Sequence, residues 1–113
     1  MFRIGFMQKT RKISAEEAKT LLEQNKNILL LDVRTPEEYR SVHIPGSTLL
    51  PLNDLQDNIQ KYAPEKDRPI LIYCLSGARA DTACRILAGM GYTDVVSMGG
   101  IRSWKYKLEG TGR

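Results

Sequence analysis

The sequence predicts an α/β domain in three layers, with a mainly parallel central sheet of about five strands and helices on both faces. Short apolar segments alternate with longer segments of helical periodicity, which is the pattern of a parallel sheet whose crossovers are helices. The run Ile70–Tyr73 is β-prone and non-alternating, as expected for a strand buried on both faces. With 113 residues, the chain is long enough for one domain and too short for two.

The first helix is predicted from a capping box, in which Ser14 is followed by Glu17 and then by an apolar stripe. A short apolar strand is expected over residues 28–31. Thr35 and Pro36 then provide a cap and a proline at the first helical position, and two acidic residues follow them. These features predict a short second helix.

The second half of the chain supplies further strands and two longer helices. A strand is expected over residues 47–50, and helical spacing follows over residues 52–59. After the run Ile70–Tyr73, a helix with a stripe of small apolar residues is expected to begin at Ala80 and to stop near Gly91. Residues 95–98 are expected to form a last strand, which ends at a turn of two glycines.

Residues 11–108 are expected to form the domain. Residues 1–10 are expected to be an N-terminal extension that is flexible, and residues 109–113 a C-terminal tail that is loose from Gly110 onward. The first ten residues lack the apolar core of a signal peptide, and no later run has the length of a membrane span. We therefore expect a cytoplasmic location and no membrane partner.

The composition is that of an ordinary globular chain, with 42% hydrophobic and 27% charged residues. The net charge of +4 comes from scattered basic residues, so no nucleic-acid partner is expected. The two cysteines, Cys74 and Cys84, form neither a close redox pair nor a metal-binding framework. Because one is expected in a loop and the other in a helix, a disulfide between them is disfavoured.

The segment around Cys74 carries the most specific chemical signal. Cys74 follows the strand Ile70–Tyr73, and open α/β sheets bind ligands at the carboxyl ends of their strands. The loop after it leads into a helix, so unpaired N–H groups and the positive end of the helix dipole can face the sulfur and favour a thiolate. The sequence therefore predicts an anion-binding loop around a nucleophilic sulfur. Its residues are Leu75, Ser76, Gly77, Ala78 and Arg79.

The role of Arg79 is open at this point. Its guanidinium could bind the substrate anion, or it could hold the loop through backbone carbonyls or a carboxylate such as that of Asp32. Asp32 and Arg34 follow the end of the neighbouring strand and could support the same rim. For these two residues, a structural ion pair or a helix cap is the favoured interpretation.

Three further residues are predicted to be structural. Cys84 lies on the apolar stripe of the helix that follows the loop, which favours a place in the core. His43, the only histidine, lies in a proline turn and is expected to be a satisfied structural residue. Trp104 is expected to cover the core.

The chain resembles the rhodanese family of sulfurtransferases, in the form of a single catalytic domain. The order and spacing of several sequence blocks fit the family from about Ile13 to Trp104. These blocks are Leu31–Tyr39, His43–Gly46, Cys74–Arg79, Gly91–Tyr92 and Gly99–Ile101 with Trp104.

The resemblance implies sulfur transfer in two steps. The Cys74 thiolate would attack the outer sulfur of a donor such as thiosulfate and become a persulfide, and sulfite would leave. An acceptor, either cyanide or a small-molecule or protein thiol, would then take the outer sulfur. Loop N–H groups would stabilise the anion, and neither a metal nor an organic cofactor is needed.

Two other functions are open. Cysteine phosphatases place five residues between their cysteine and arginine, whereas four separate Cys74 from Arg79, so a phosphatase or an arsenate reductase is disfavoured. A regulatory or persulfide-carrying binding module is the second alternative. Leu75 stands where many thiosulfate-active relatives have a basic or polar residue, and Ala80 stands where serine is frequent. The presence of Cys74 favours the enzyme over this module.

Overall fold

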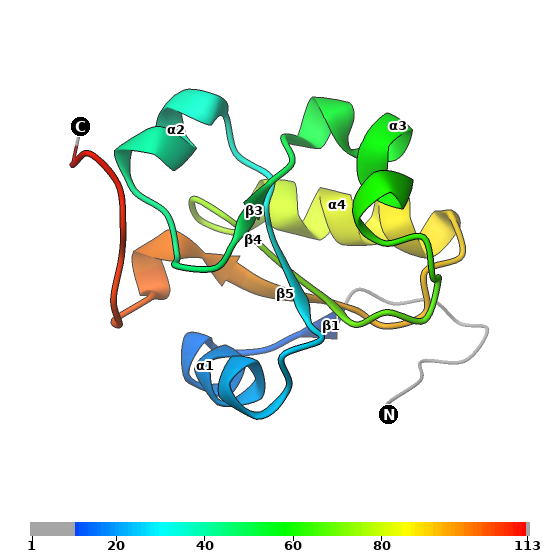
Figure 1. Cartoon of the computed structure of the whole chain (residues 1–113), viewed down its shortest axis with the longest axis horizontal. Helices are drawn as coiled ribbons and strands as arrows, with labels where there is room; N and C mark the ends of the chain where they lie inside the picture. Colours follow the sequence, from blue (N-terminus) through cyan, green and yellow to red (C-terminus); the bar gives the residue numbers. More distant parts are fainter. Residues whose placement is uncertain (1–10, 113) are drawn as a thin grey trace.

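The computed structural model describes residues 11–112, and the predicted N-terminal extension lies outside the described residues. Its five strands form one sheet in the order β1-β5-β4-β2-β3, and each neighbouring pair is parallel (Figure 1). The predicted α/β class and the predicted parallel sheet are therefore confirmed. The strands are β1 (Arg11–Lys12), β2 (Leu29–Asp32), β3 (Thr48–Leu49), β4 (Ile70–Cys74) and β5 (Val95–Gly100). The helices are α1 (Ala15–Gln24), α2 (Pro36–Ser41), α3 (Leu52–Tyr62), α4 (Ala78–Gly89) and the 3-10 turn η1 (Ile101–Ser103).

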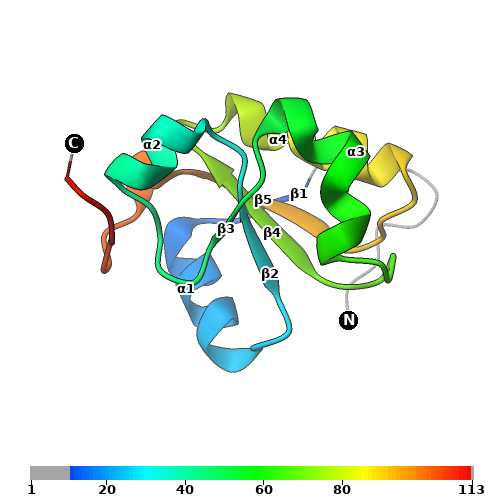
Figure 2. The same cartoon turned by 45° about the horizontal axis from the view of Figure 1, so that its top comes forward.

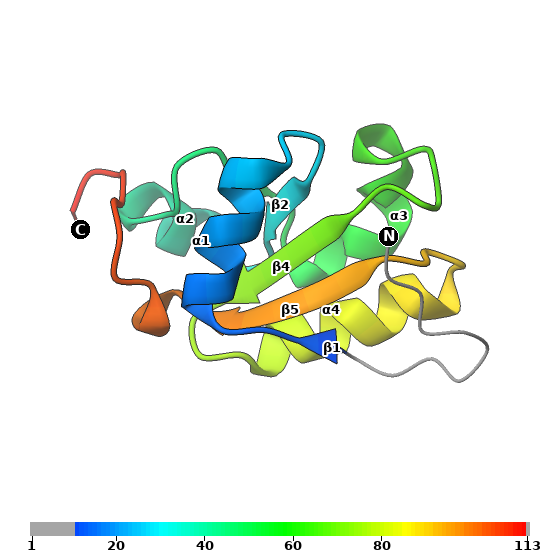
Figure 3. The same cartoon turned by 90° about the horizontal axis from the view of Figure 1, so that it is seen from below.

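Helices cover both faces of the sheet, which makes the three predicted layers. Helices α3 and α4 lie on one face and α1 on the other, as Figure 2 shows in a tilted view and Figure 3 from below. An apolar core fills the space on each side of the sheet. No helix within residues 11–112 is long and apolar enough to cross a bilayer.

The central strand β4 contributes to both cores. Ile70, Ile72 and Cys74 belong to the core under α3 and α4, whereas Leu71 and Tyr73 belong to the core under α1. All five residues are buried. Two-sided burial explains why this strand is apolar without alternation.

The predicted helix caps are present. Helices α1 and α2 both begin with complete capping boxes, the first formed by Ser14 and Glu17 and the second by Thr35 and Glu38. After α4, Gly91 adopts a φ of +99°, and the N–H of Tyr92 donates to the carbonyl of Leu87. This left-handed C-terminal cap confirms that Gly91 stops the helix.

Helix α4 begins at Ala78, and the prediction that it begins at Ala80 was wrong by two residues. Gly77 is the N-cap of this helix, with a φ of +125° and no side-chain hydrogen bond. Because a capping side chain is absent, the sequence carries no ordinary signal for this start. The earlier start matters chemically, since it brings the first turn of the helix next to Cys74.

The strand limits differ modestly from those expected. β2 and β3 lie within one residue of the predicted ranges at each end, whereas β5 continues to Gly100 and does not end at a turn of two glycines. Ile72 pairs with Ser97 and Cys74 pairs with Gly100, so β5 has one extra residue opposite β4. A bulge of this kind, with Gly99 at a φ of +82°, lets the strand continue past the predicted turn.

The described part of the C-terminal tail is bound to the domain. His43 and Glu109 exchange both backbone hydrogen bonds, and the N–H of Thr111 donates to the carbonyl of Arg40. The N–H of Gly112 donates to the end of α2 in the same way. The expectation that the chain is loose from Gly110 onward was therefore wrong for residues 110–112, because backbone hydrogen bonds hold this segment to the end of α2.

Candidate active site

Cys74 lies at the end of β4, at the carboxyl edge of the sheet. Its side chain is only 1% exposed. The backbone N–H groups of Gly77 and Ala80 donate to its Sγ atom at 3.0 and 3.3 Å. Helix α4 starts at this point, so the positive end of its dipole also faces the sulfur. This environment stabilises negative charge on Sγ.

The donors to the sulfur differ in part from the predicted loop residues. Gly77 is a donor as expected, whereas Ala80 was placed outside the predicted set. In residues 11–112, Leu75, Ser76 and Ala78 make no hydrogen bond to Sγ. Ala80 is a donor because α4 starts early, which puts its N–H in the first helical turn, where backbone donors have no partner within the helix.

The loop after Cys74 rests on the second glycine at the end of β5. A Cβ atom on Gly100 would lie 2.1 Å from the carbonyl oxygen of Leu75 and 2.5 Å from the Cα of Ser76. The N–H of Arg102 donates to the same carbonyl of Leu75 at 3.3 Å. Gly100, one of the two glycines that the sequence assigned to a turn, therefore lies directly against the loop, and a side chain at this position would collide with the loop backbone.

Arg79 binds a carboxylate, but this carboxylate is not the one named from the sequence. Its Nη1 and Nη2 atoms donate to Oε1 and Oε2 of Glu38 at 2.8 and 3.1 Å, which joins α4 to α2. Asp32 was the suggested partner, and that suggestion was wrong. The partners are 41 residues apart, and the sequence indicated Glu38 only as an acidic residue in the first turn of α2, so spacing alone gave no signal for the ion pair.

Glu38 is held in its ionised form by this arrangement. The hydrogen bonds from Arg79 are the main cause that lowers the pKa of the Glu38 carboxyl from 4.5 to about 2. The N–H and hydroxyl of Thr35 donate to the same carboxylate at 2.9 and 3.1 Å. Glu38 thus carries a full negative charge at neutral pH, opposite the charge of Arg79.

Asp32 and Arg34 form the structural ion pair that the sequence favoured. Arg34 Nη2 donates to Asp32 Oδ2 at 2.7 Å, and the two side chains are 0% and 2% exposed. The same Nη2 atom donates to the carbonyl of Val42 at 2.6 Å. The pair therefore fastens the end of β2 to the segment after α2, and neither residue bonds to the sulfur of Cys74.

The other residues that the sequence assigned to structure are engaged in packing. His43 stacks on the ring of Tyr39 at 3.8 Å, and its Nδ1 lies 2.7 Å from the carbonyl oxygen of the same residue. Trp104 is buried in the core under α1. Cys84 is buried in the other core, and burial raises the pKa of its thiol from 9.0 to about 12. Cys84 therefore stays a neutral thiol.

Sequence reasoning missed the role of Tyr73. Its buried hydroxyl accepts the N–H of Ile44 at 3.0 Å and lies 3.1 Å from Oγ of Ser47. Burial is the main cause that raises the pKa of this hydroxyl above its ordinary value. A tyrosine in an otherwise aliphatic strand was the available signal, because a buried hydroxyl needs partners. Tyr73 anchors the proline turn behind the strand that ends at Cys74.

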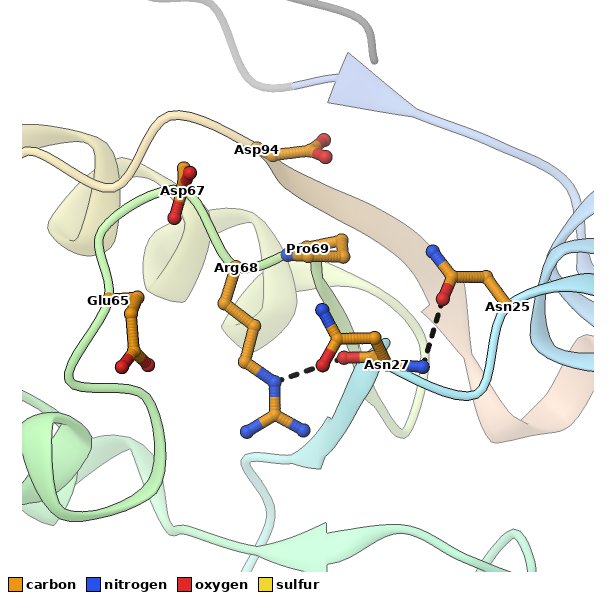
Figure 4. A pocket seen from close by; sticks show the side chains of 7 residues that line it. All are labelled: Asn25, Asn27, Glu65, Asp67, Arg68, Pro69 and Asp94. Carbon is orange, nitrogen blue, oxygen red and sulfur yellow. Dashed lines mark hydrogen bonds between the residues drawn. The ribbon is translucent and has the colours of Figure 1, made fainter.

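A cavity of about 580 Å³ lies at the opposite edge of the sheet, before β2, β4 and β5 (Figure 4). Arg68 Nε donates to the carbonyl of Asn27 at 3.0 Å, and its Nη1 donates to the carbonyl of Tyr62 at 2.9 Å. The lining residues include neither cysteine nor histidine. They are Asn25, Asn27, Glu65, Asp67, Arg68, Pro69 and Asp94. Across residues 11–112, no group of three or more His, Cys, Asp or Glu side chains is placed to hold a metal ion.

Comparison with known proteins agrees with this geometry. Residues 14–107 match the rhodanese-like domain family. The chain is 36% identical to thiosulfate sulfurtransferase PspE of Escherichia coli K12 over 72 residues, which cover 64% of this chain and 69% of the relative. It is 34% identical to thiosulfate sulfurtransferase GlpE of Pseudomonas syringae over 100 residues, which cover 88% and 91%.

Solved structures give the same result. The crystal structure of a thiosulfate sulfurtransferase from Pseudomonas aeruginosa is similar with a TM-score of 0.82 and 26% identity, covering 92% of this chain and 21% of that one. The chain belongs to the rhodanese-like domain family. Within that family, it is a sulfurtransferase.

Proposed function

We propose that this protein transfers a sulfane sulfur from thiosulfate or another persulfide donor to a thiophilic acceptor through a persulfide on Cys74. The observation that carries the proposal is the pair of N–H donors from Gly77 and Ala80 to the Cys74 sulfur. These donors, at the positive end of α4, suit a sulfur nucleophile that works as an anion.

The two steps balance without a cofactor or a general base. The Cys74 thiolate attacks the outer sulfur of thiosulfate, a new S–S bond forms, the S–S bond of the donor breaks, and sulfite leaves with the electron pair. Cyanide or a thiolate then attacks the outer sulfur of the persulfide, and thiocyanate or a new persulfide leaves. The electron pair of the broken bond returns to Cys74 as the thiolate.

Two features of the site favour sulfur transfer over phosphate chemistry. Cys74 is almost fully buried, which suits attack on a terminal sulfur atom better than attack on a phosphorus atom surrounded by four oxygens. In addition, both Nη atoms of Arg79 donate to Glu38, so the charge of this guanidinium is already paired with a carboxylate and does not face a free phosphate site. A phosphatase or an arsenate reductase would need that arginine.

Thiocyanate formation from thiosulfate and cyanide tests the proposal with two matched variants. Cys74→Ser should lower the rate by at least about a hundredfold, because a serine hydroxyl is not ionised at neutral pH. Cys84→Ala, the control for losing a buried thiol, should keep the rate within about twofold of wild type. Activity that depends on Cys84 in a folded protein would contradict the assignment.

The persulfide-carrying module remains the second candidate, and it predicts a different result. In that case, wild-type protein would accept one sulfur atom from a donor but would release thiocyanate no faster than a free thiol does. Hydrolysis of an aryl phosphate without any sulfur transfer would contradict both candidates. The thiol acceptor and the cytoplasmic location stay predictions of the sequence.

A further inference from the structure

Arg79 lies in the chain between the sulfur donors but directs its charge to a different group. Gly77 and Ala80, on either side of it, both donate backbone N–H groups to Sγ of Cys74. The Arg79 guanidinium, by contrast, binds Glu38 on α2 with two hydrogen bonds. The cation nearest in sequence to the reacting sulfur is therefore already matched by an anion.

Glu38 stays ionised near neutral pH, so its negative charge continues to compensate the positive charge of Arg79. Its carboxylate also accepts the N–H of Thr35, so it is fixed at both the helix cap and the ion pair. Its lowered pKa keeps it ionised well into the acidic range. The side chains of Arg79 and Glu38 are 34% and 29% exposed, so an ion outside the loop still experiences their charges.

We propose that Glu38 is a specificity-determining residue, which neutralises Arg79 and so favours singly charged sulfur donors over the doubly charged thiosulfate ion. The proposal rests on the function proposed above and names the donor class of the same site. The apolar Leu75 was the sequence-based reason to expect weak attraction of thiosulfate. Leu75 is half-buried and packs against the core under α1. Because Leu75 carries no charge, we assign the discrimination between singly and doubly charged donors to Glu38.

The physical basis is the charge of the donor. Attraction of a donor to an uncompensated guanidinium scales with the donor's charge, so a dianion gains about twice as much as a monoanion. With Glu38 present, this differential attraction is cancelled. Repulsion between the Cys74 thiolate and the donor also scales with charge, and it then disfavours the dianion.

Thiosulfate and methanethiosulfonate form a matched pair of donors for the test. Both present a terminal sulfur bonded to a sulfonyl sulfur, but thiosulfate carries two charges and methanethiosulfonate carries one. In each case, the thiolate takes the terminal sulfur, the donor's S–S bond breaks, and sulfite or methanesulfinate leaves with the electron pair. With cyanide as the acceptor, kcat/KM for the donor reports this first half-reaction in both cases.

The measured quantity is the ratio of kcat/KM for thiosulfate to that for methanethiosulfonate. Glu38→Gln keeps an oxygen for the helix cap but leaves Arg79 uncompensated, and it should raise this ratio about fivefold, mostly through KM for thiosulfate. Glu37→Gln removes the same charge from the neighbouring exposed position of α2 and should change the ratio by less than about twofold. The effect of Glu38→Gln should shrink at high salt.

A second variant tests the opposite charge change. Arg79→Gln leaves Glu38 as an uncompensated anion and should lower the ratio about fivefold. Arg85→Gln, on the exposed face of the same helix, is its matched control and should leave the ratio nearly unchanged. Because each ratio is measured on one protein preparation, partial loss of folded protein does not alter it.

The outcomes separate this inference from the proposed function. The inference is supported if the ratio of the two kcat/KM values rises in Glu38→Gln and falls in Arg79→Gln, while the two control variants leave it nearly unchanged. If both donors load Cys74 but the ratio stays within about twofold of wild type in both variants, this inference alone is overturned. If neither donor adds sulfur to wild-type Cys74, the proposed function fails and this inference fails with it.

Discussion

The two edges of the parallel sheet present opposite electrostatic environments. At the carboxyl edge, α4 begins, and its free N–H groups point to the buried sulfur of Cys74. At the amino edge, α3 ends, and its Tyr62 carbonyl accepts a hydrogen bond from Arg68 beside an open cavity. One edge therefore stabilises an anion and the other a cation. The comparison teaches that helix direction, and not cavity volume, distinguishes the edge at which we propose that the reaction takes place.

The largest effect is expected from adding a methyl group beneath the active-site loop. Gly100→Ala would place Cβ 2.1 Å from the carbonyl oxygen of Leu75, so the loop must move. We expect a loss of about 3 kcal/mol in the free energy of unfolding, together with loss of most sulfur transfer. Urea unfolding and the thiocyanate assay measure the two effects.

Gly89→Ala is the control, because a Cβ there meets nothing within 4 Å and the residue lies in helix α4. It should stabilise the protein by about 0.5 kcal/mol and leave activity intact. If Gly100→Ala behaved like Gly89→Ala, the loop would not depend on the close approach of β5, and the structural basis of the reactive edge would be wrong.

An intermediate effect is expected from the ion pair between Glu38 and Arg79. Because the pKa of Glu38 is lowered in the folded protein to about 2, its contribution to stability is fully present above its ordinary value of 4.5. That contribution should disappear as the pH falls through about 2. At pH 7, Glu38→Gln should lower the free energy of unfolding by about 1 kcal/mol.

The measurement is urea unfolding of wild type and Glu38→Gln as a function of pH. The difference between the two proteins should be constant from pH 7 to about 5 and should shrink below that. A difference that stays the same at acidic pH would show that the variant acts through packing and not through the charge of Glu38.

The smallest effect on sulfur transfer is expected at the opposite edge of the sheet. Arg68→Gln removes the two hydrogen bonds to the carbonyls of Asn27 and Tyr62 and should lower the free energy of unfolding by about 1 kcal/mol. Sulfur transfer at saturating donor should stay within about twofold of wild type. Dependence of activity on Arg68 would break the division between a reactive edge and a structural edge.

Periodicity and capping signals were sufficient to predict the strands β2 to β5, the helices α1 to α4 and the position of Cys74 at a strand end, but not the short edge strand β1. They failed where the answer depended on contacts between distant residues. Glu38 was expected only as an acidic residue in the first turn of α2, and its bond to Arg79 depends on how α2 packs against α4. The support that Gly100 gives to the loop depends on a bulge, which shifts the pairing of two strands.

The most direct test of the account locates the transferred sulfur. After incubation with thiosulfate or methanethiosulfonate, mass spectrometry of the intact protein and of its peptides should find one added sulfur atom on Cys74 and none on Cys84. Cyanide should remove it as thiocyanate, and Cys74→Ser should acquire none. Sulfur on Cys84, or no added sulfur with either donor, would contradict the assignment of Cys74 as the residue that carries sulfur.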